Sequence, residues 1–184
     1  MPRKILAAGI GVFLLIGGGV FFMLASRPSL PSSNAPDYRN GTYYINDQAV
    51  TLVNGFSAVP AAPGSASQIV TRYFGNAVST DLNGDGRPDI VFLLTQNAGG
   101  SGTFYYAVAA LNTPQGYEGT HAFFLGDRIA PQPTDVGPDG TIIVNYADRA
   151  PGENFSVPPS VGTSRYLRFD PSSLSLKEIT PSHS

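Results

Sequence analysis

Two nearly continuous apolar runs, at residues 90–94 and 104–111, constrain the fold of this chain more than any other feature. Both runs are rich in β-branched and aromatic residues, and turn-forming residues lie close to each end. An apolar run of this length without polar alternation indicates a strand that is covered on both faces or packed inside a sandwich. The sequence therefore predicts two central strands, joined by the flexible connection "NAGGSG" at residues 97–102.

The remaining apolar segments after residue 36 are short, and Gly, Pro, Asn and Asp separate them, which is the pattern of strands and turns. Further strands are expected at residues 41–45, 49–53, 68–74, 120–125, 141–146, 164–170 and 174–179. "NDQ" suggests a hairpin between the first two, and residues 170–173 suggest a turn between the last two. No window of a dozen residues has a convincing helical period. The predicted fold is mainly β, a single β-sandwich or curved-sheet domain.

The segment at residues 5–25 has a different character, because it contains no charged and no strongly polar residue. As a helix it would extend roughly 31 Å, which matches a bilayer core of about 30 Å. Arg3 and Lys4 precede it and favour a cytoplasmic N-terminus. A cleaved signal peptide is the rival interpretation, but its apolar region is normally only about 7–15 residues long. Pilin-like subunits have a similar layout with a glutamate near the start of the helix, which this chain lacks.

The sequence thus predicts a single-pass protein of the cell membrane with its C-terminal domain outside the cytoplasm. Its parts are a cytoplasmic end (1–4), a transmembrane anchor (5–25), a linker rich in proline and serine (26–36), an extracytoplasmic β-domain (37–180) and a tail (181–184). From residue 37 onward eight Arg and Lys oppose thirteen Asp and Glu, a formal net charge of −5. This balance, without a basic patch, excludes nucleic acid as an expected partner.

Polar residues at alternating positions precede the first apolar run, in "DLNGDGRPD" at residues 81–89. Ca²⁺ takes six to eight oxygen ligands, and a short loop supplies them from side chains at positions 1, 3 and 5 and a carbonyl at position 7. Counted from the first aspartate, the expected ligands are Asp81, Asn83, Asp85, the Arg87 carbonyl and, at position 9, Asp89. A turn rich in Asp, Asn and Gly that binds no metal is the alternative.

This loop is no EF-hand, since position 12 is Phe92 where an EF-hand has a glutamate. The spacing, followed at once by an apolar strand, resembles the calcium loops of FG-GAP and VCBS-type repeats over about residues 73–94. A propeller needs several blades, so only the loop carries over. More broadly, residues 41–169 contain "PGSASQIVTRYFG", "DLNGDGRPDIVFLLTQNAGGSGTFYYAVAAL", "FLGDRIAP" and "VNYADRAPGE" in this order. This order looks like that of an uncharacterised family of membrane-anchored bacterial extracytoplasmic proteins. That likeness implies a location and no activity.

Two Asp-Arg pairs form a candidate second site. Asp127-Arg128 and Asp148-Arg149 each end a predicted strand and precede a proline. They are expected either to converge on a carboxylated or polar ligand, or simply to tether their own loops. Seven tyrosines could also form a carbohydrate or peptide platform or pack in the core: Tyr43, Tyr44, Tyr73, Tyr105, Tyr106, Tyr117 and Tyr146. Adjacent strand residues face opposite sides, so at most one of Tyr105 and Tyr106 joins a platform.

Motifs for catalysis are weak in this chain. There are two histidines and no cysteine, and no nucleophile elbow or zinc motif is present, so no catalytic residue is predicted. The expected function is a membrane-anchored, calcium-stabilised binding module for an envelope protein or polymer. The alternative is a cell-envelope hydrolase that uses carboxylates such as Glu118 and Asp127. A third interpretation is an accessory subunit of a membrane complex, held through the anchor helix.

Overall fold

The computed structural model describes residues 37–180 and is mainly β, as the sequence predicts. In chain order its elements are η1 (Tyr38–Asn40), β1 (Thr42–Ile45), β2 (Gln48–Thr51), β3 (Phe56–Pro60), β4 (Gln68–Thr80), β5 (Asp89–Asn97), β6 (Phe104–Thr113), β7 (Gly116–Gly119), β8 (Phe123–Asp127), β9 (Ala130–Val136), η2 (Pro138–Gly140), β10 (Ile142–Asp148), β11 (Val161–Asp170) and β12 (Ser175–Glu178). Within this range no helix has the length and apolar character needed to cross a membrane. The predicted cytoplasmic end, anchor, linker and tail lie outside the described residues.

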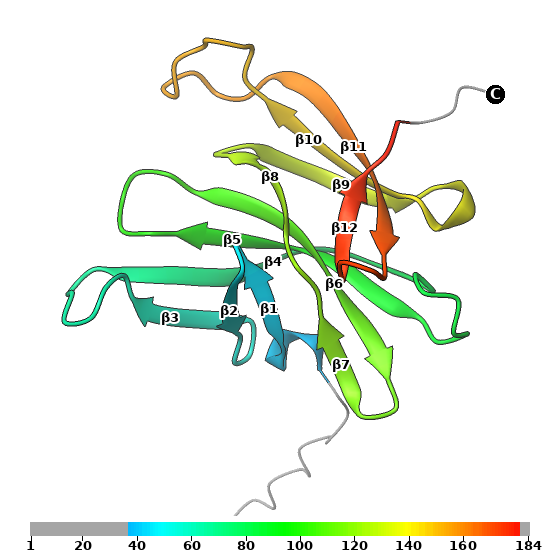
Figure 1. The fold of residues 1–184 in the computed structure, drawn as a ribbon. Helices are drawn as coiled ribbons and strands as arrows, with labels where there is room; N and C mark the ends of the chain where they lie inside the picture. Colours follow the sequence, from blue (N-terminus) through cyan, green and yellow to red (C-terminus); the bar gives the residue numbers. More distant parts are fainter. Residues whose placement is uncertain (1–36, 181–184) are drawn as a thin grey trace, which may run out of the picture. The chain divides into compact units, whose positions relative to one another are not determined.

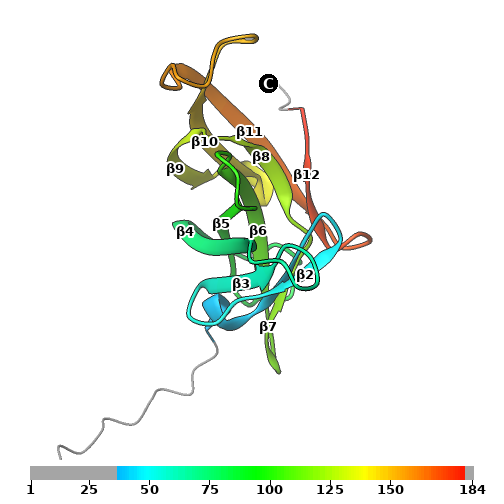
Figure 2. The same ribbon diagram turned by 90° about the vertical axis from the view of Figure 1, so that its left-hand side faces the viewer.

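Three sheets form the layers of residues 37–180. A six-stranded sheet has the order β3-β4-β5-β6-β7, and β8 pairs with β6 beyond the end of β7. A four-stranded sheet has the order β12-β11-β10-β9, and β1 with β2 forms a hairpin. Every pairing between the strands named above is antiparallel, and His121 forms isolated parallel bridges with Tyr44 and Ser175. Figures 1 and 2 show the four-stranded sheet on one side of β4–β6 and the hairpin on the other.

Strands β5 and β6 lie between two separate hydrophobic cores, which explains their unbroken apolar sequences. Alternate side chains of β5, such as Val91 and Leu93, face the four-stranded sheet, where they meet Ile142, Val144 and Leu167. The intervening side chains face the hairpin, where Phe92, Leu94, Tyr106 and Val108 meet Tyr43, Ile45 and Leu52. The prediction of central strands covered on both faces is therefore confirmed. Tyr105 and Tyr106 also face opposite sides, as expected from their adjacency.

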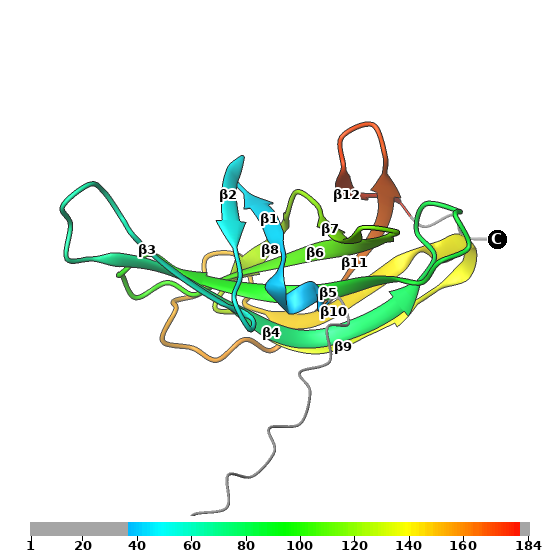
Figure 3. The same cartoon turned by 90° about the horizontal axis from the view of Figure 1, so that it is seen from below.

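The hairpin crosses the sheet at close range, and its strands run across the direction of β4–β6 (Figure 3). A Cβ at Gly119 would lie 2.1 Å from the backbone oxygen of Thr42, so only glycine fits where β7 meets β1. The aromatic ring of Phe92 contacts Tyr43 edge to face at a centroid distance of 5.2 Å, and it also contacts Tyr38 and Tyr73. Aromatic packing therefore fixes the hairpin to the sheet.

Several strand boundaries differ from the sequence prediction. Strands β3, β7 and β9 were not expected: β3 and β9 are edge strands containing prolines, and β7 has only four residues. The strand predicted at 120–125 is wrong in its first half, because residues 120–122 cross between sheets. There the Tyr44 N–H donates to the Thr120 carbonyl, and the Ala122 N–H donates to the Tyr44 carbonyl. The His121 N–H donates to the Leu174 carbonyl. Strand β4 continues six residues past its predicted end, through bulges near Gly75.

Candidate metal centre

The loop between β4 and β5 is held together by hydrogen bonds from its backbone to its own side chains. The Asp81 carboxylate accepts from the N–H groups of Gly84 and Gly86, both at 2.8 Å, and from that of Asp85 at 3.2 Å. These bonds hold the pKa of Asp81 below its usual value, and the bond from Gly86 has the largest effect. Gly84 and Gly86 have φ values of 78° and 82°, which favour glycine and allow the sharp turn.

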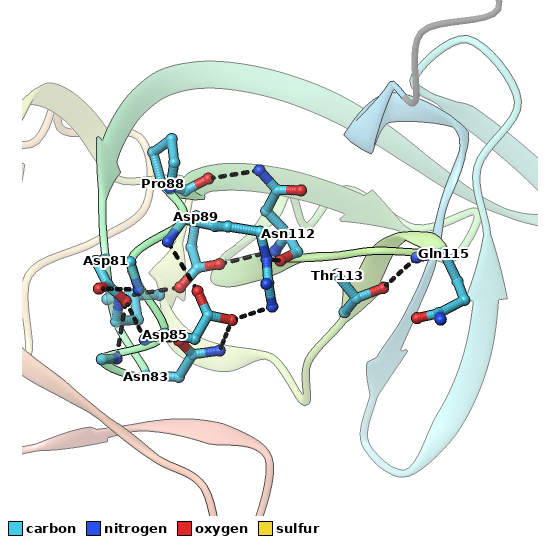
Figure 4. A network of polar contacts seen from close by, with 12 residues as sticks. Asp81, Asn83, Asp85, Pro88, Asp89, Asn112, Thr113 and Gln115 are labelled. Atoms are coloured by element: carbon cyan, nitrogen blue, oxygen red, sulfur yellow. Dashed lines mark hydrogen bonds and ion pairs between the residues drawn. The ribbon is translucent and has the colours of Figure 1, made fainter.

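The ninth residue of the loop, Asp89, is fully buried and begins β5. Its Oδ2 accepts from the Leu82 N–H at 2.9 Å, and its Oδ1 accepts from the Asn112 N–H at 2.7 Å. Leu82 lies at the start of the loop, whereas Asn112 lies near the end of β6. One buried carboxylate therefore joins the loop to both central strands (Figure 4).

A second set of contacts ties the end of the loop to Asn112. The Arg87 Nε donates to the Asn112 carbonyl at 2.6 Å, and the Asn112 side-chain amide donates to the Pro88 carbonyl at 3.3 Å. The Arg87 guanidinium also forms an ion pair with Asp85. Sequence analysis missed Asn112, because its place beside the loop depends on the pairing of β5 with β6 and not on any local motif.

The donor set suits a hard cation. Asp81, Asn83, Asp85 and Asp89 gather at one end of the β5–β6 pair (Figure 4). All offered ligand atoms are oxygens, and a carboxylate has about four lone-pair sites, so it can accept N–H groups and still bind an ion. Within residues 37–180, however, no three carboxylate or imidazole groups are close enough to form a metal cluster. Binding would therefore require the loop side chains to draw together, with Asp85 released from the Arg87 guanidinium.

The two Asp-Arg pairs lie next to each other, at the ends of β8 and β10. Asp127 accepts from Arg128 Nη2 at 2.8 Å and from the Thr103 N–H at 2.9 Å. Arg149 Nη1 donates to the Arg128 carbonyl at 2.9 Å, and its Nε donates to the Val157 carbonyl. These bonds match the loop-tethering interpretation. Ligand binding by the four residues stays a prediction.

An aromatic ring completes this cluster. The guanidinium carbons of Arg128 and Arg149 lie 3.8 Å and 5.3 Å from the ring centroid of Phe155, which is half exposed. Such cation–π contacts stabilise the loop between β10 and β11. Both guanidinium groups thus make hydrogen bonds and ring contacts within the protein.

The carboxylates considered for hydrolysis lie far apart. Glu118 pairs with Leu111 and Asp127 pairs with Phe104, seven positions apart along β6. At about 3.3 Å per residue their backbones are roughly 23 Å apart, whereas glycosidase carboxylates are about 5–9.5 Å apart. Glu118 and Asp127 therefore do not form a catalytic pair.

Comparisons with known proteins add no assignment to this geometry. No protein-family model, no curated protein and no solved structure matches the chain.

Proposed function

We propose that the chain is a calcium-stabilised β-domain that is held to the outer side of a membrane and acts as a binding module. The observation that carries the proposal is the buried Asp89, which links the 81–89 loop to β5 and β6. An ion held by this loop would stabilise the two strands at the centre of both hydrophobic cores. The proposed role of Ca²⁺ is structural.

The ligands would be the side chains of Asp81, Asn83, Asp85 and Asp89 and the Arg87 carbonyl. Their spacing resembles FG-GAP and VCBS-type loops, and their oxygen-only chemistry favours Ca²⁺ over zinc or copper. The ion would offset the mutual repulsion of three carboxylates and part of the net charge of −5. A binding role is favoured over hydrolysis because Glu118 and Asp127 are separated along β6.

Calorimetric titration of the chelator-treated, full-length chain in detergent tests the ion site. One Ca²⁺ per chain is expected to bind, and Asp85→Asn should weaken binding about tenfold or more, because it removes a negative charge from the ligand set. The fold should survive, since asparagine keeps an oxygen that can accept the Arg87 N–H. Asp47→Asn is the matched control, because its 94 % exposed side chain lies in the β1–β2 turn. Equal affinity in wild type and Asp85→Asn would refute the site.

The membrane location is a separate part of the proposal and rests on the apolar, uncharged segment at residues 5–25. The full-length chain is expected to stay in the membrane pellet after alkaline carbonate extraction, because a spanning helix is not removed by high pH. A chain without residues 1–25 should be released. Release of the full-length chain would show that it has no spanning anchor.

A further inference from the structure

A hollow lined by aromatic rings and amides lies where the β1–β2 hairpin ends. Its volume is about 390 Å³, and its lining residues are Asn46, Gln96, Ala98, Phe104, Tyr106 and Phe124. This volume lies within the usual range of small-molecule sites, about 300–1,000 Å³. No residue of the lining carries a charge.

The hollow lies where the β1–β2 hairpin is too short to cover the whole face of β5 and β6. The hairpin covers one face of β5 and β6 as far as Ile45, the last residue of β1. Beyond it that face continues with Gln96 and Phe104, next to the buried Tyr106, and Phe124 of β8 pairs with Tyr106. Asn46 begins the hairpin turn with a φ of 50° and also lines the hollow. The end of the β5–β6 face that the hairpin leaves uncovered therefore forms the floor of the hollow.

Three rings and two carboxamides set the chemistry of the hollow. The Phe124 ring centroid lies 5.5 Å from that of Tyr106 and 6.3 Å from that of Phe104, and the Phe124 side chain is 52 % exposed. Gln96 donates from Nε2 to Thr71 Oγ1 at 3.2 Å, which fixes its amide group and leaves the amide oxygen as an acceptor. Asn46 supplies a second carboxamide to the lining.

We propose that this hollow binds a neutral sugar ring of an envelope polymer. A sugar presents an apolar C–H face that packs on aromatic rings, and hydroxyl groups that pair with carboxamides, which both donate and accept. An ionic ligand would find no counter-charge in the lining, and a purely apolar one would leave the amide oxygen of Gln96 without a donor, since only the amide nitrogen of Gln96 is bonded to Thr71. This inference rests on the proposed function and names its ligand class and surface.

The test is calorimetric titration of the full-length chain, in detergent and excess Ca²⁺, with two probes: the β-1,4-linked tetramers of glucose and of N-acetylglucosamine. Saturable binding of at least one tetramer is expected. Phe124→Ala should weaken it about tenfold, because the most exposed stacking surface is lost. Gln96→Ala should weaken it as well, since it removes an amide from the wall.

Phe74→Ala is the matched control. Phe74 is also about half exposed and contacts a tyrosine of β6, but that tyrosine is Tyr105, whose side chain faces the other side of the sheet. Affinity for the tetramer should not change in this variant. No saturable binding of either tetramer, or equal losses in Phe74→Ala and Phe124→Ala, would overturn the inference. Self-association that only Phe124→Ala abolishes, without sugar binding, would instead make the hollow an interface between copies.

The same samples separate the two proposals, because the melting temperature of each is measured with Ca²⁺ and with chelator. A chain that is stabilised by Ca²⁺ but binds neither tetramer refutes the sugar site alone. A chain that binds a tetramer equally well with chelator, and is not stabilised by Ca²⁺, refutes the ion site alone.

Discussion

Asp89→Ala is expected to lower the free energy of unfolding by about 3–5 kcal/mol. Asp89 is fully buried, and its two oxygens accept the N–H groups of Leu82 and Asn112. Its removal leaves two N–H groups without partners, and each costs about 1–3 kcal/mol when it is buried. It also separates the loop from β6, so the loss should appear in chelator as well as in Ca²⁺. Urea unfolding of the full-length protein in both conditions measures the effect.

Two variants give this prediction its controls. Asp89→Asn keeps one acceptor oxygen and should cost about half as much as alanine, since one of the two N–H groups keeps its partner. Glu118→Ala removes an exposed carboxylate of β7 and should change stability by no more than about 0.5 kcal/mol. If Asp89→Ala is as stable as Glu118→Ala, Asp89 does not hold the loop to the strands.

The central part of the fold was predictable because its signals are local. The apolar runs of β5 and β6 indicate strands covered on both faces, and the hairpin turn at Asn46 and Asp47 is marked by residues that tolerate positive φ. Edge strands carry weaker signals. Strand β9 contains Pro131 and Pro133, which a sequence pattern assigns to a loop, yet an edge strand tolerates residues without an N–H donor on its open side.

The candidate site was predictable in its loop and not in its surroundings. The spacing of Asp81, Asn83 and Asp85 around two glycines indicates the turn, and the structure places their backbone-to-side-chain hydrogen bonds there. Asn112 lies 23 residues from Asp89, so only the register of β5 with β6 brings the two together. The ion pair of Arg87 with Asp85 was also not expected, because the sequence indicated only the backbone carbonyl of Arg87 as a metal ligand.

The largest effect after loss of Asp89 is expected from removal of the ion. Ca²⁺ at about 100 times its dissociation constant would stabilise the folded state by about 2.7 kcal/mol, provided that it binds only the folded state. In a domain of this size that corresponds to a rise of roughly 6–10 °C in the melting temperature. The unfolding enthalpy should rise with the melting temperature, because unfolding has a positive heat-capacity change.

Scanning calorimetry of the full-length chain, in excess Ca²⁺ and in excess chelator, therefore tests the central claim most directly. Wild type and the exposed-loop control Asp47→Asn should both melt several degrees higher with Ca²⁺, and Asp85→Asn should lose most of that increase. Equal melting temperatures of the wild-type protein in Ca²⁺ and in chelator would contradict the claim that the 81–89 loop binds Ca²⁺ and stabilises the central strands.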